Sequence, residues 1–438
     1  MTLCDQAPSL CETRPPAMPY QWFVGIDWGS QTHQVCVLDC ARHRIGERVV
    51  EHCGASLAQL ATWLTDLAAG NPCQVAVAIE VPRGAVVETL VERGFHVFAI
   101  NPKQLDRFRD RYTLAGAKDD RRDAFVLADA LQTNPQSFRQ VHLDEPQLLV
   151  LRELSRAEEA LLEEFRRATN RLRDQLHRFY PQMLRLCPAA DEAWLWDLLE
   201  LAPTPTHTTH LTEAQVHRLL KTHRIRRVQV IDVLETLRAP ALQVAPGATD
   251  AARAHIALLL PCLRVVAAQL KACAHQVDTL LATLADAEVA PAGFSDVAIV
   301  RSLPGVGRKI TAWLFAEAAQ PLGARDYETL RAQGGVAPVT RQSGKRRQVV
   351  MRHSCNRRLR HALFHMARVA MKNDVAFRSI YTTCRAKGQS HGRALRGIAD
   401  RLLRMLVTML RDRTLYDATR VRYVTGGQSV GKKITSEA

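Results

Sequence analysis

The sequence predicts an α/β N-terminal domain, a long helical middle region and a mostly α, basic C-terminal domain. Three features lead to this prediction. Short apolar runs separated by turn residues open the chain, two long stretches with helical periodicity follow, and the last third is rich in Lys and Arg. A chain of 438 residues has room for about two to four domains. Its 47% hydrophobic and 24% charged content excludes a fibrous or disordered protein.

The N-terminal domain begins with three apolar or alternating runs that are typical of strands. They are Trp22–Trp28, His33–Asp39 and Ile45–Glu51. Strands and helices then alternate: helices are predicted over Ser56–Ala69, Gly84–Arg93, 101–111 and Asp119–Thr133, and strands over Gln74–Glu80 and Phe95–Ile100. Three leading strands followed by this alternation are the plan of the ribonuclease H fold, a mixed sheet with helices on its faces.

The middle of the chain predicts two long amphipathic helices, at Pro146–Tyr180 and Ala251–Ala287. The segment between them, 181–250, reads as an irregular insert. The two helices can pair antiparallel within one chain or form a coiled coil between copies. The spacing of their apolar residues fits both arrangements equally. Further on we expect two short helices within Ala298–Ala319, then a Gly- and Pro-rich stretch. Two basic helices follow, at Asn356–Lys372 and Arg393–Arg411.

These patterns divide the chain into five predicted segments. They are a disordered arm at 1–20, an α/β domain on the ribonuclease H plan at 21–145, a helical or coiled-coil region with an insert at 146–295, a basic C-terminal domain at 296–425, and a disordered tail at 426–438.

The charge of the chain predicts a polyanionic partner. The net charge is +15, and it is uneven: from Arg301 onward there are 28 Lys and Arg against 8 Asp and Glu, which leaves the rest of the chain net negative by 5. Such a basic region binds nucleic acid or an anionic membrane face. No uninterrupted apolar run reaches the roughly 18 residues of a membrane span, and the N-terminus lacks a signal-peptide pattern.

Eleven cysteines without a CxxC pair are typical of reduced, buried thiols in an intracellular protein. We therefore expect a cytoplasmic, nucleoid-associated bacterial protein that acts on DNA, with no membrane partner.

Four carboxylates are candidates for one site in the N-terminal domain. Asp27 ends the first strand, Glu80 ends the fourth, and Asp120 and Asp123 share a face at the start of the last helix. Clustered carboxylates stay ionised beside a cation, and oxygen-only ligation favours Mg²⁺ or Mn²⁺. The alternative is structural, since an Asp after a strand often forms a turn and acidic residues complement a helix dipole. Asp119 competes with Asp120 as the third ligand.

Two basic motifs lie in the C-terminal domain. Leu303–Gly307 followed by Arg308 and Lys309 is similar to a helix–hairpin–helix turn, in which Gly305 and Gly307 would let backbone N–H groups approach a phosphate. A tight helix–helix turn is the alternative.

The second motif places Ser343 among cations, where it could contact phosphate or attack phosphorus, although an ordinary solvated loop has the same composition. The surrounding candidates for phosphate contact are Arg341, Lys345, Arg346, Arg347, Asn356, Arg357 and Arg358.

Four segments together resemble the transposases of the IS110 family, and within it the IS1111-like branch. They are VGIDWGSQTHQVCVLD, AIEVPRGAVVETL, the stretch from INPKQLDRFRD to KDDRRDAFVLADAL, and LRSLPGVGRK with GGVAPVTRQSGKRRQ and NRRLRHAL. The pattern Lys118–Ala124 favours Asp120 over Asp119. The chain departs from the family at Lys345, where a second Gly is frequent, and at Arg352–Cys355.

The resemblance implies that 21–145 is a RuvC-like domain with a metal-binding DEDD tetrad of Asp27, Glu80, Asp120 and Asp123. It also implies a serine nucleophile at Ser343 in the C-terminal domain. It also implies DNA recombination through a circular intermediate, a structured guide RNA and a homo-oligomer, a dimer or tetramer. The competing predictions are a metal-dependent, Holliday-junction resolvase-like nuclease that uses the carboxylates without a serine, and a non-catalytic nucleic-acid-binding protein.

Overall fold

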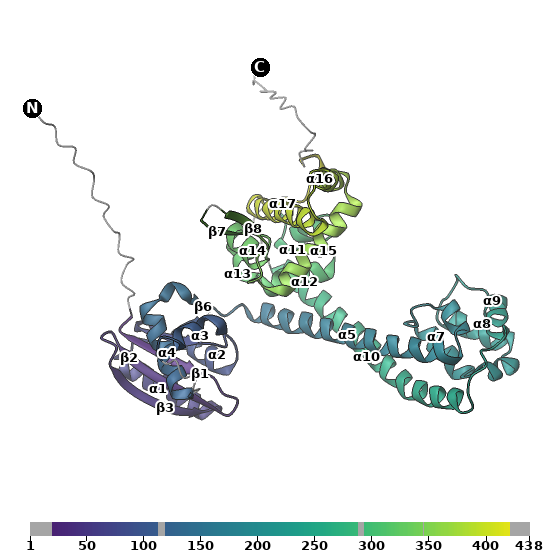
Figure 1. Ribbon diagram of the computed structural model, residues 1–438, viewed down its shortest axis with the longest axis horizontal. Helices are drawn as coiled ribbons and strands as arrows, with labels where there is room; N and C mark the ends of the chain where they lie inside the picture. The colour runs from purple at the N-terminus through teal and green to yellow at the C-terminus, as the bar shows by residue number, and fades with distance from the viewer. Residues whose placement is uncertain (1–19, 113–118, 288–292, 345, 421–438) are drawn as a thin grey trace, which may run out of the picture. The chain divides into compact units, whose positions relative to one another are not determined.

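The structure is a computed structural model that describes residues 20–112, 119–287, 293–344 and 346–420 (Figure 1). Contacts divide the chain into two compact units, Met1–Leu143 and Asp144–Ala438. Apart from Tyr20, the predicted arm at 1–20 lies outside the described residues, and so does the predicted tail at 426–438.

A six-stranded mixed sheet forms the first unit, in the order β3-β2-β1-β4-β5-β6. The strands are β1 (Trp22–Asp27), β2 (Thr32–Asp39), β3 (Arg44–Glu51), β4 (Val75–Ile79), β5 (His96–Ala99) and β6 (Arg139–Gln140). Strand β1 pairs antiparallel with β2 and parallel with β4, so the predicted ribonuclease H-like arrangement is confirmed. The sequence analysis missed β6, because two exposed polar residues carry no periodicity.

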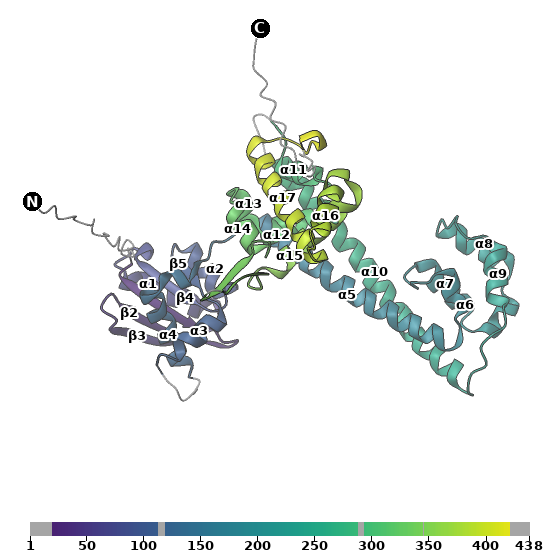
Figure 2. The same ribbon diagram turned by 45° about the horizontal axis from the view of Figure 1, so that its top comes forward.

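Helices cover both faces of this sheet (Figures 1 and 2). They are α1 (Gly54–Leu67), α2 (Ala85–Glu92), α3 (Pro102–Arg109) and α4 (Asp120–Thr133). Alternate strand residues enter two separate cores: Val24 and Ile26 pack with α1 and α2, whereas Phe23 packs with α3 and α4. Because both faces are buried, β4 (VAVAI) is apolar at every position.

Two long helices, α5 (Pro146–Phe179) and α10 (Ala248–Ala287), organise the second unit. Leu151 near the start of α5 packs with Val277 and Leu281 near the end of α10, so the pair is antiparallel within one chain. Of the two arrangements that the sequence allowed, the structure has the intramolecular one.

The segment between the long helices is helical, so the prediction of an irregular stretch over 181–250 is wrong. It forms α6 (Gln182–Leu186), α7 (Ala193–Leu201), α8 (Glu213–Thr222) and α9 (Val230–Arg238). Each helix has only 5 to 10 residues, too few for a clear periodic signal. Their apolar residues, with the fully buried Trp194 among them, share a core with facing residues of α5 and α10.

The rest of the second unit is mostly helical, as predicted. Its helices are α11 (Asp296–Ser302), α12 (Arg308–Glu317), α13 (Ala319–Gly323), α14 (Tyr327–Gln333), α15 (Arg357–Asn373), α16 (Val375–Ala386) and α17 (His391–Asp412). They enclose one core built around α15 and α17. The Gly- and Pro-rich stretch holds a hairpin that the sequence analysis missed, β7 (Val339–Ser343) and β8 (Arg346–Val350). Its residues are almost all exposed, so no buried alternation marks the strands.

Two expectations about composition need correction. Helix α10 contains an 18-residue window of mean hydropathy 1.7, long and apolar enough to cross a membrane by length and composition alone. The sequence analysis counted uninterrupted apolar runs, whereas α10 mixes polar residues into its apolar ones and packs along α5. Among the nine cysteines described, all free, four are exposed and not buried as predicted: Cys40, Cys53, Cys73 and Cys262.

Candidate metal site and nucleic-acid interface

The sheet topology brings Asp27 and Glu80 to one edge. Strands β1 and β4 run parallel, with Ile26 opposite Ile79. The next residues are therefore neighbours: Asp27 is the last residue of β1, and Glu80 directly follows β4. Asp123 lies in the first turn of α4, and its residue is 1% exposed. Asp120 is the first residue of α4 and is exposed, while Asp119 is the N-cap and accepts a hydrogen bond from the Arg121 amide. Asp119 thus has a structural task of its own.

A glycine sets the distance between α4 and β1. A Cβ atom at Gly25 would lie 1.9 Å from the Ala124 carbonyl oxygen and 2.7 Å from the Ala128 amide nitrogen. No side chain fits there, so the backbones of strand and helix touch. This contact brings Asp123, next to Ala124, toward the strand that ends in Asp27.

A guanidinium group lies between two of the four carboxylates. Arg109 Nε donates to Asp123 Oδ1 at 2.7 Å and Arg109 Nη2 to Asp123 Oδ2 at 2.8 Å, while Nη2 lies 4.0 Å from Glu80 Oε2. Burial lowers the pKa of Arg109, but the hydrogen bond and charge of Asp123 outweigh it and raise that pKa. Glu80 and Asp123 therefore face one positive group, and an oxygen-only donor set of this kind suits a divalent cation such as Mg²⁺.

Another group of potential ligands lies in the second unit. Among the described residues, ligand atoms of Cys187, Asp191 and Glu192 lie within 4.8 Å of one another, a spacing that the four carboxylates do not reach as a group. Glu192 already accepts hydrogen bonds from Arg227 at 2.6 Å and from the Trp194 indole at 2.9 Å. This charge is satisfied by protein groups, so the cluster serves the local fold.

Ser343 lies at the end of β7, beside the hairpin turn. Its cross-strand partner is Arg346, and Arg341 pairs with Gln348. Because residues two apart and directly opposite share a face, Arg341 and Arg346 lie on the face of Ser343, whereas Arg347, opposite Gln342, lies on the other. Gly344 follows with a φ of 53°, and Lys345 lies outside the described residues. The exposed Ser343 thus shares one face of the hairpin with two exposed arginines.

Comparison with known proteins covers both of these regions. A family model described as "Transposase", which carries DEDD and IS110 in its designation, matches residues 24–181. A second, described as "Transposase IS116/IS110/IS902 family", matches residues 297–382. The chain belongs to the IS110 family of transposases. The first match contains all four carboxylates and the second contains the hairpin with Ser343.

Several IS110-family relatives are similar along most of their length. "Mini-circle putative transposase for IS117" of Streptomyces coelicolor is 28% identical over 91% of this chain and 96% of its own. "Insertion element IS110 uncharacterized 43.6 kDa protein" of the same organism is 27% identical over 90% and 95%. "Putative transposase y4uE" of Sinorhizobium fredii is 50% identical, but the match spans only 47% of this chain and 57% of that protein.

In this family member the helix–hairpin–helix candidates are engaged inside the protein. Arg308 donates to both carboxylate oxygens of Glu158, at 2.9 and 2.6 Å, and Lys309 lies 3.4 Å from Glu158 Oε1. Gly305 has a φ of 84°, and a Cβ there would lie 2.7 Å from the Val369 side chain. Gly307 is the N-cap of α12 and has open space around it. The contacts of Gly305 and Arg308 serve helix packing, and their phosphate role stays a prediction.

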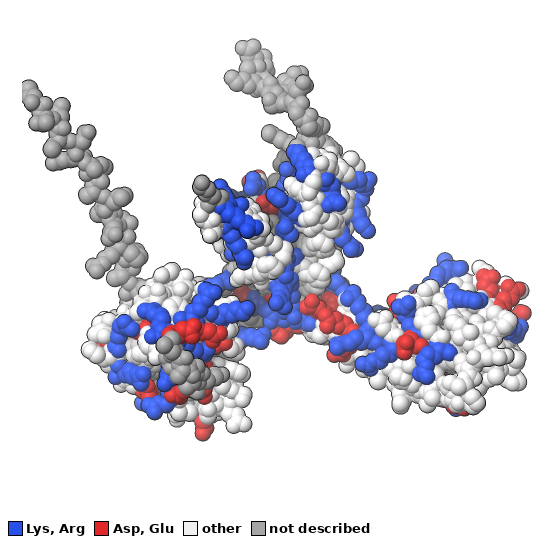
Figure 3. All heavy atoms as spheres, viewed as in Figure 1, with Lys and Arg blue, Asp and Glu red and all other residues white. Residues whose placement is uncertain are grey.

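Residues at the start of α15 are divided between structure and surface. Asn356 caps α15 and donates to Glu317 Oε2 at 2.7 Å. Arg358 Nε donates to Glu159 at 2.7 Å, whereas Arg357 is exposed. Arg357 is thus the better placed of the two arginines for an external phosphate. Figure 3 shows Lys and Arg gathered over the hairpin and the C-terminal helices.

Sequence reasoning missed several residues at these sites. Gly25 and Arg109 belong to segments that the sequence analysis quoted for the family resemblance. Arg109 is one of several charged residues in its segment, and nothing in the spacing around Gly25 distinguishes it from other glycines. Arg360 and Arg396 line a cavity of about 630 Å³ beside α15 and α17, and only the folded structure brings them together.

Proposed function

We propose that the chain cuts and rejoins DNA at the ends and target of an insertion element, using Ser343 as nucleophile and the Asp27, Glu80, Asp120 and Asp123 tetrad as a metal site. The observation that carries the proposal is the pairing of two features. Glu80 and Asp123 already share one cationic group in the first matched region. In the second, Ser343 is exposed and shares a face of the hairpin with Arg341 and Arg346.

The chemistry assigned to the hairpin is a phosphoryl transfer. The Ser343 hydroxyl loses its proton and its oxygen forms a bond to phosphorus, while a bond from phosphorus to a sugar oxygen breaks and that oxygen takes up a proton. A sugar hydroxyl of the new partner strand then loses its proton and attacks the same phosphorus, and the serine oxygen leaves and takes up a proton. Arg341 and Arg346, on the face of Ser343, bind the phosphate oxygens as negative charge builds up on them.

Mg²⁺ or Mn²⁺ bound by Asp27, Glu80, Asp120 and Asp123 would supply positive charge to the phosphate and its leaving oxygen. The all-oxygen donor set and the DEDD designation of the matched family model support this assignment. Without the cation, Arg109 holds Asp123 in position, and the N-cap role of Asp119 leaves Asp120 as the preferred third ligand.

The partners follow from charge and from the long helices. DNA is the expected polyanion for the basic C-terminal residues, and we assign a structured guide RNA and a bacterial nucleoid location by the family resemblance. A homo-oligomer, dimer or tetramer, is supported by the outer face of α10, where Leu258 is 74% and Val265 is 56% exposed, seven residues apart. The proposed domains remain 21–145, 146–295 and 296–425.

The test is detection of the excised circular junction in cells that carry the gene with its native flanking DNA. Wild type should give the junction, and Asp27→Asn and Ser343→Ala should each abolish it. Matched controls are Asp66→Asn on α1 and Ser354→Ala before α15, both exposed side chains that should leave the junction intact. A junction that survives Ser343→Ala but not Asp27→Asn would contradict the serine mechanism and favour a nuclease that uses the carboxylates alone.

A further inference from the structure

A cavity of about 630 Å³ lies in the second unit, away from the exposed serine. Its wall is formed by α15, α17, the Gly334–Val336 turn and Met351, the residue that follows β8. The volume falls in the range of about 300–1,000 Å³ that small ligands occupy. The hairpin that carries Ser343 is thus rooted in the wall of this cavity.

Three arginines in the wall, Arg357, Arg360 and Arg396, have no acidic partner among the described residues, and Arg357 is the exposed one of the three. In the described part of the chain, no carboxylate pairs with Arg360 or Arg396, and both are half-buried. Arg360 Nη1 is buried with no hydrogen-bond partner among the described groups. Arg396 Nη1 donates to the Met351 thioether at 3.4 Å, a weak acceptor. Arg358, by contrast, is neutralised by Glu159.

This arrangement favours an anion. Burial, and then the charge of Arg393, lower the pKa of the Arg396 guanidinium, which means that its positive charge is destabilised where it lies. A half-buried charge without a counter-ion is costly, and a phosphate with its several acceptor oxygens would satisfy both arginines.

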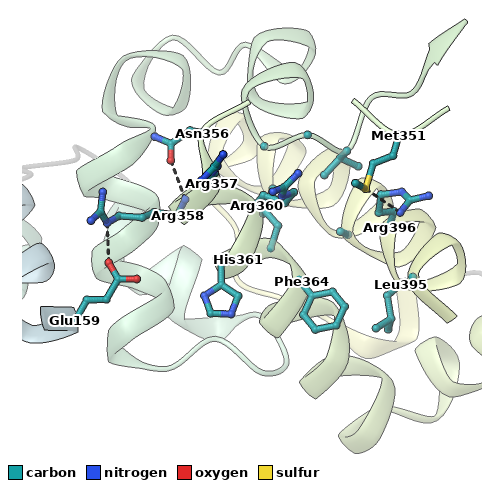
Figure 4. A pocket seen from close by; sticks show the side chains of 16 residues that line it. Glu159, Met351, Asn356, Arg357, Arg358, Arg360, His361, Phe364, Leu395 and Arg396 are labelled. Carbon is teal, nitrogen blue, oxygen red and sulfur yellow. Dashed lines mark hydrogen bonds and ion pairs between the residues drawn. The ribbon is translucent and has the colours of Figure 1, made fainter. Parts of the chain in front are cut away.

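The opposite side of the cavity is apolar and aromatic. It includes Leu395, Phe364 and the ring of His361 (Figure 4). In that view the guanidinium groups of Arg360 and Arg396 lie above the rings of His361 and Phe364. A ligand for this cavity therefore has an anionic part and a flat apolar part.

The two lining rings belong to a longer row of aromatic side chains. Their ring centroids are separated by 4.5 to 6.4 Å, and the row runs through Trp313, His361, His365, Phe364, His391 and Tyr381. Trp313 and His361 are stacked, with 25° between their planes. Burial, and then His361 and Arg368, lower the pKa of His365, so its ring is neutral at neutral pH. Rings beside a basic surface are the common platform for unpaired bases.

We propose that this cavity binds one unpaired nucleotide of the nucleic acid that the chain holds, with its phosphate at Arg360 and Arg396 and its base against His361 and Phe364. The inference rests on the proposed function, because it takes the substrate to be DNA with or without a guide RNA. A nucleotide extruded from a helix here would fix the strand beside the root of the Ser343 hairpin.

The experiment measures binding of the full-length protein to four labelled duplexes. Two are DNA and two are RNA, and in each pair one duplex carries a single unpaired 2-aminopurine and the other is fully paired. Wild type should bind an unpaired probe about tenfold tighter than its paired counterpart, since stacking of one base contributes about that factor. The 2-aminopurine fluorescence should fall as the base stacks on the rings. The arm that shows the preference, DNA or RNA, identifies the source of the nucleotide.

The variant Arg360→Gln/Arg396→Gln should lose this preference while retaining binding to the paired probe. Its control, Arg368→Gln/Arg401→Gln, removes the same charge from exposed positions of the same two helices and should keep the preference. Phe364→Leu, which leaves the charges in place, should reduce the preference and the fluorescence change.

Equal binding of paired and unpaired probes by wild type would overturn the inference and leave the proposed function standing. The inference would also be overturned if the control variant lost the preference for the unpaired probe as fully as Arg360→Gln/Arg396→Gln does. A wild type that binds none of the four probes would overturn the proposed function together with the inference.

Discussion

At the scale of single residues, Arg109 is the side chain that most constrains the acidic site. Its guanidinium makes two hydrogen bonds to the buried Asp123 and approaches Glu80. A buried carboxylate that loses such a partner is strongly destabilised. A divalent cation placed at the same carboxylates would be a replacement for the guanidinium.

We therefore expect Arg109→Ala to lower the free energy of unfolding by about 1.5–3 kcal/mol in metal-free buffer. Added Mg²⁺ should stabilise this variant more than wild type, since a ligand of the native state stabilises it by mass action. Thermal unfolding with and without Mg²⁺ measures both effects. Arg107→Ala, an exposed arginine on the same helix, is the control and should respond to Mg²⁺ as wild type does. An Mg²⁺ response of Arg109→Ala no larger than that of wild type would contradict a metal site at Glu80 and Asp123.

Glu317 is a second residue whose environment can be tested through pH. Burial raises the pKa of its carboxyl, but hydrogen bonds from Arg156 and Asn356 outweigh burial and lower it. A lowered pKa means that the ionised form stabilises the fold at pH above the unfolded value of about 4.3. This stability is lost as the pH falls through the lower pKa of the folded state.

Accordingly, Glu317→Gln should destabilise the protein by about 1.5–3 kcal/mol at pH 7 and make its unfolding free energy less dependent on pH below about 5. Denaturant unfolding from pH 7 to pH 3 measures this. Glu153→Gln is the control, because Glu153 contacts the same Arg156 at 3.5 Å but its side chain is 76% exposed. If the unfolding free energies of Glu317→Gln and wild type changed with pH in parallel, the lowered pKa of Glu317 would be refuted.

At the scale of elements, the contact between β1 and α4 decides whether Asp27 and Asp123 approach. We expect Gly25→Ala to lower the free energy of unfolding by about 3 kcal/mol or more, because its Cβ would overlap backbone atoms that cannot rotate away. Gly54→Ala, at a helix start with open space around it, is the control and should be neutral or slightly stabilising. Chemical denaturation distinguishes them, and equal stability of the two variants would show that α4 can shift without cost.

The β7–β8 hairpin gives an element-scale prediction for nucleic-acid binding. Arg346→Gln/Arg347→Gln should reduce the slope of log affinity against log salt by up to about 1.8, or about 0.9 for each DNA phosphate that the variant no longer neutralises. Arg166→Gln/Arg167→Gln removes an equal charge from exposed positions of α5 and should change the slope less. Binding titrations across salt concentrations measure the slopes, and an unchanged slope for the hairpin variant would rule out a phosphate-binding role for these two arginines.

At the scale of the whole molecule, the sequence predicts the sheet well and the small elements poorly. Its first five strands are short apolar or alternating runs, so their order along the chain follows from pattern, and the ribonuclease H plan then pairs β1 with β4. The hairpin escapes prediction because its strands bury nothing, and α6–α9 escape because each is short. Neither the exposed strands nor the short helices show a clear periodicity of apolar residues in the sequence.

The candidate sites divide in the same way. Acidic residues at strand ends can be found from sequence, and so can Ser343 within a basic run. Partners that depend on packing cannot, as the pairing of Arg308 with Glu158 shows: 150 residues separate them, and a motif that suggested phosphate binding serves a helix interface. Arg360 and Arg396 likewise become one cavity wall only when α15 and α17 pack together.

The close approach at Gly25 has a consequence for exchanging parts between relatives. Residues 22–27 and 120–133 are far apart in the chain, yet they meet backbone to backbone and must match in shape. A chimaera that takes β1 from one transposase and α4 from another would inherit two surfaces that were selected separately. Grafts that move both segments together should retain a soluble, folded N-terminal unit more often than grafts that move either one alone.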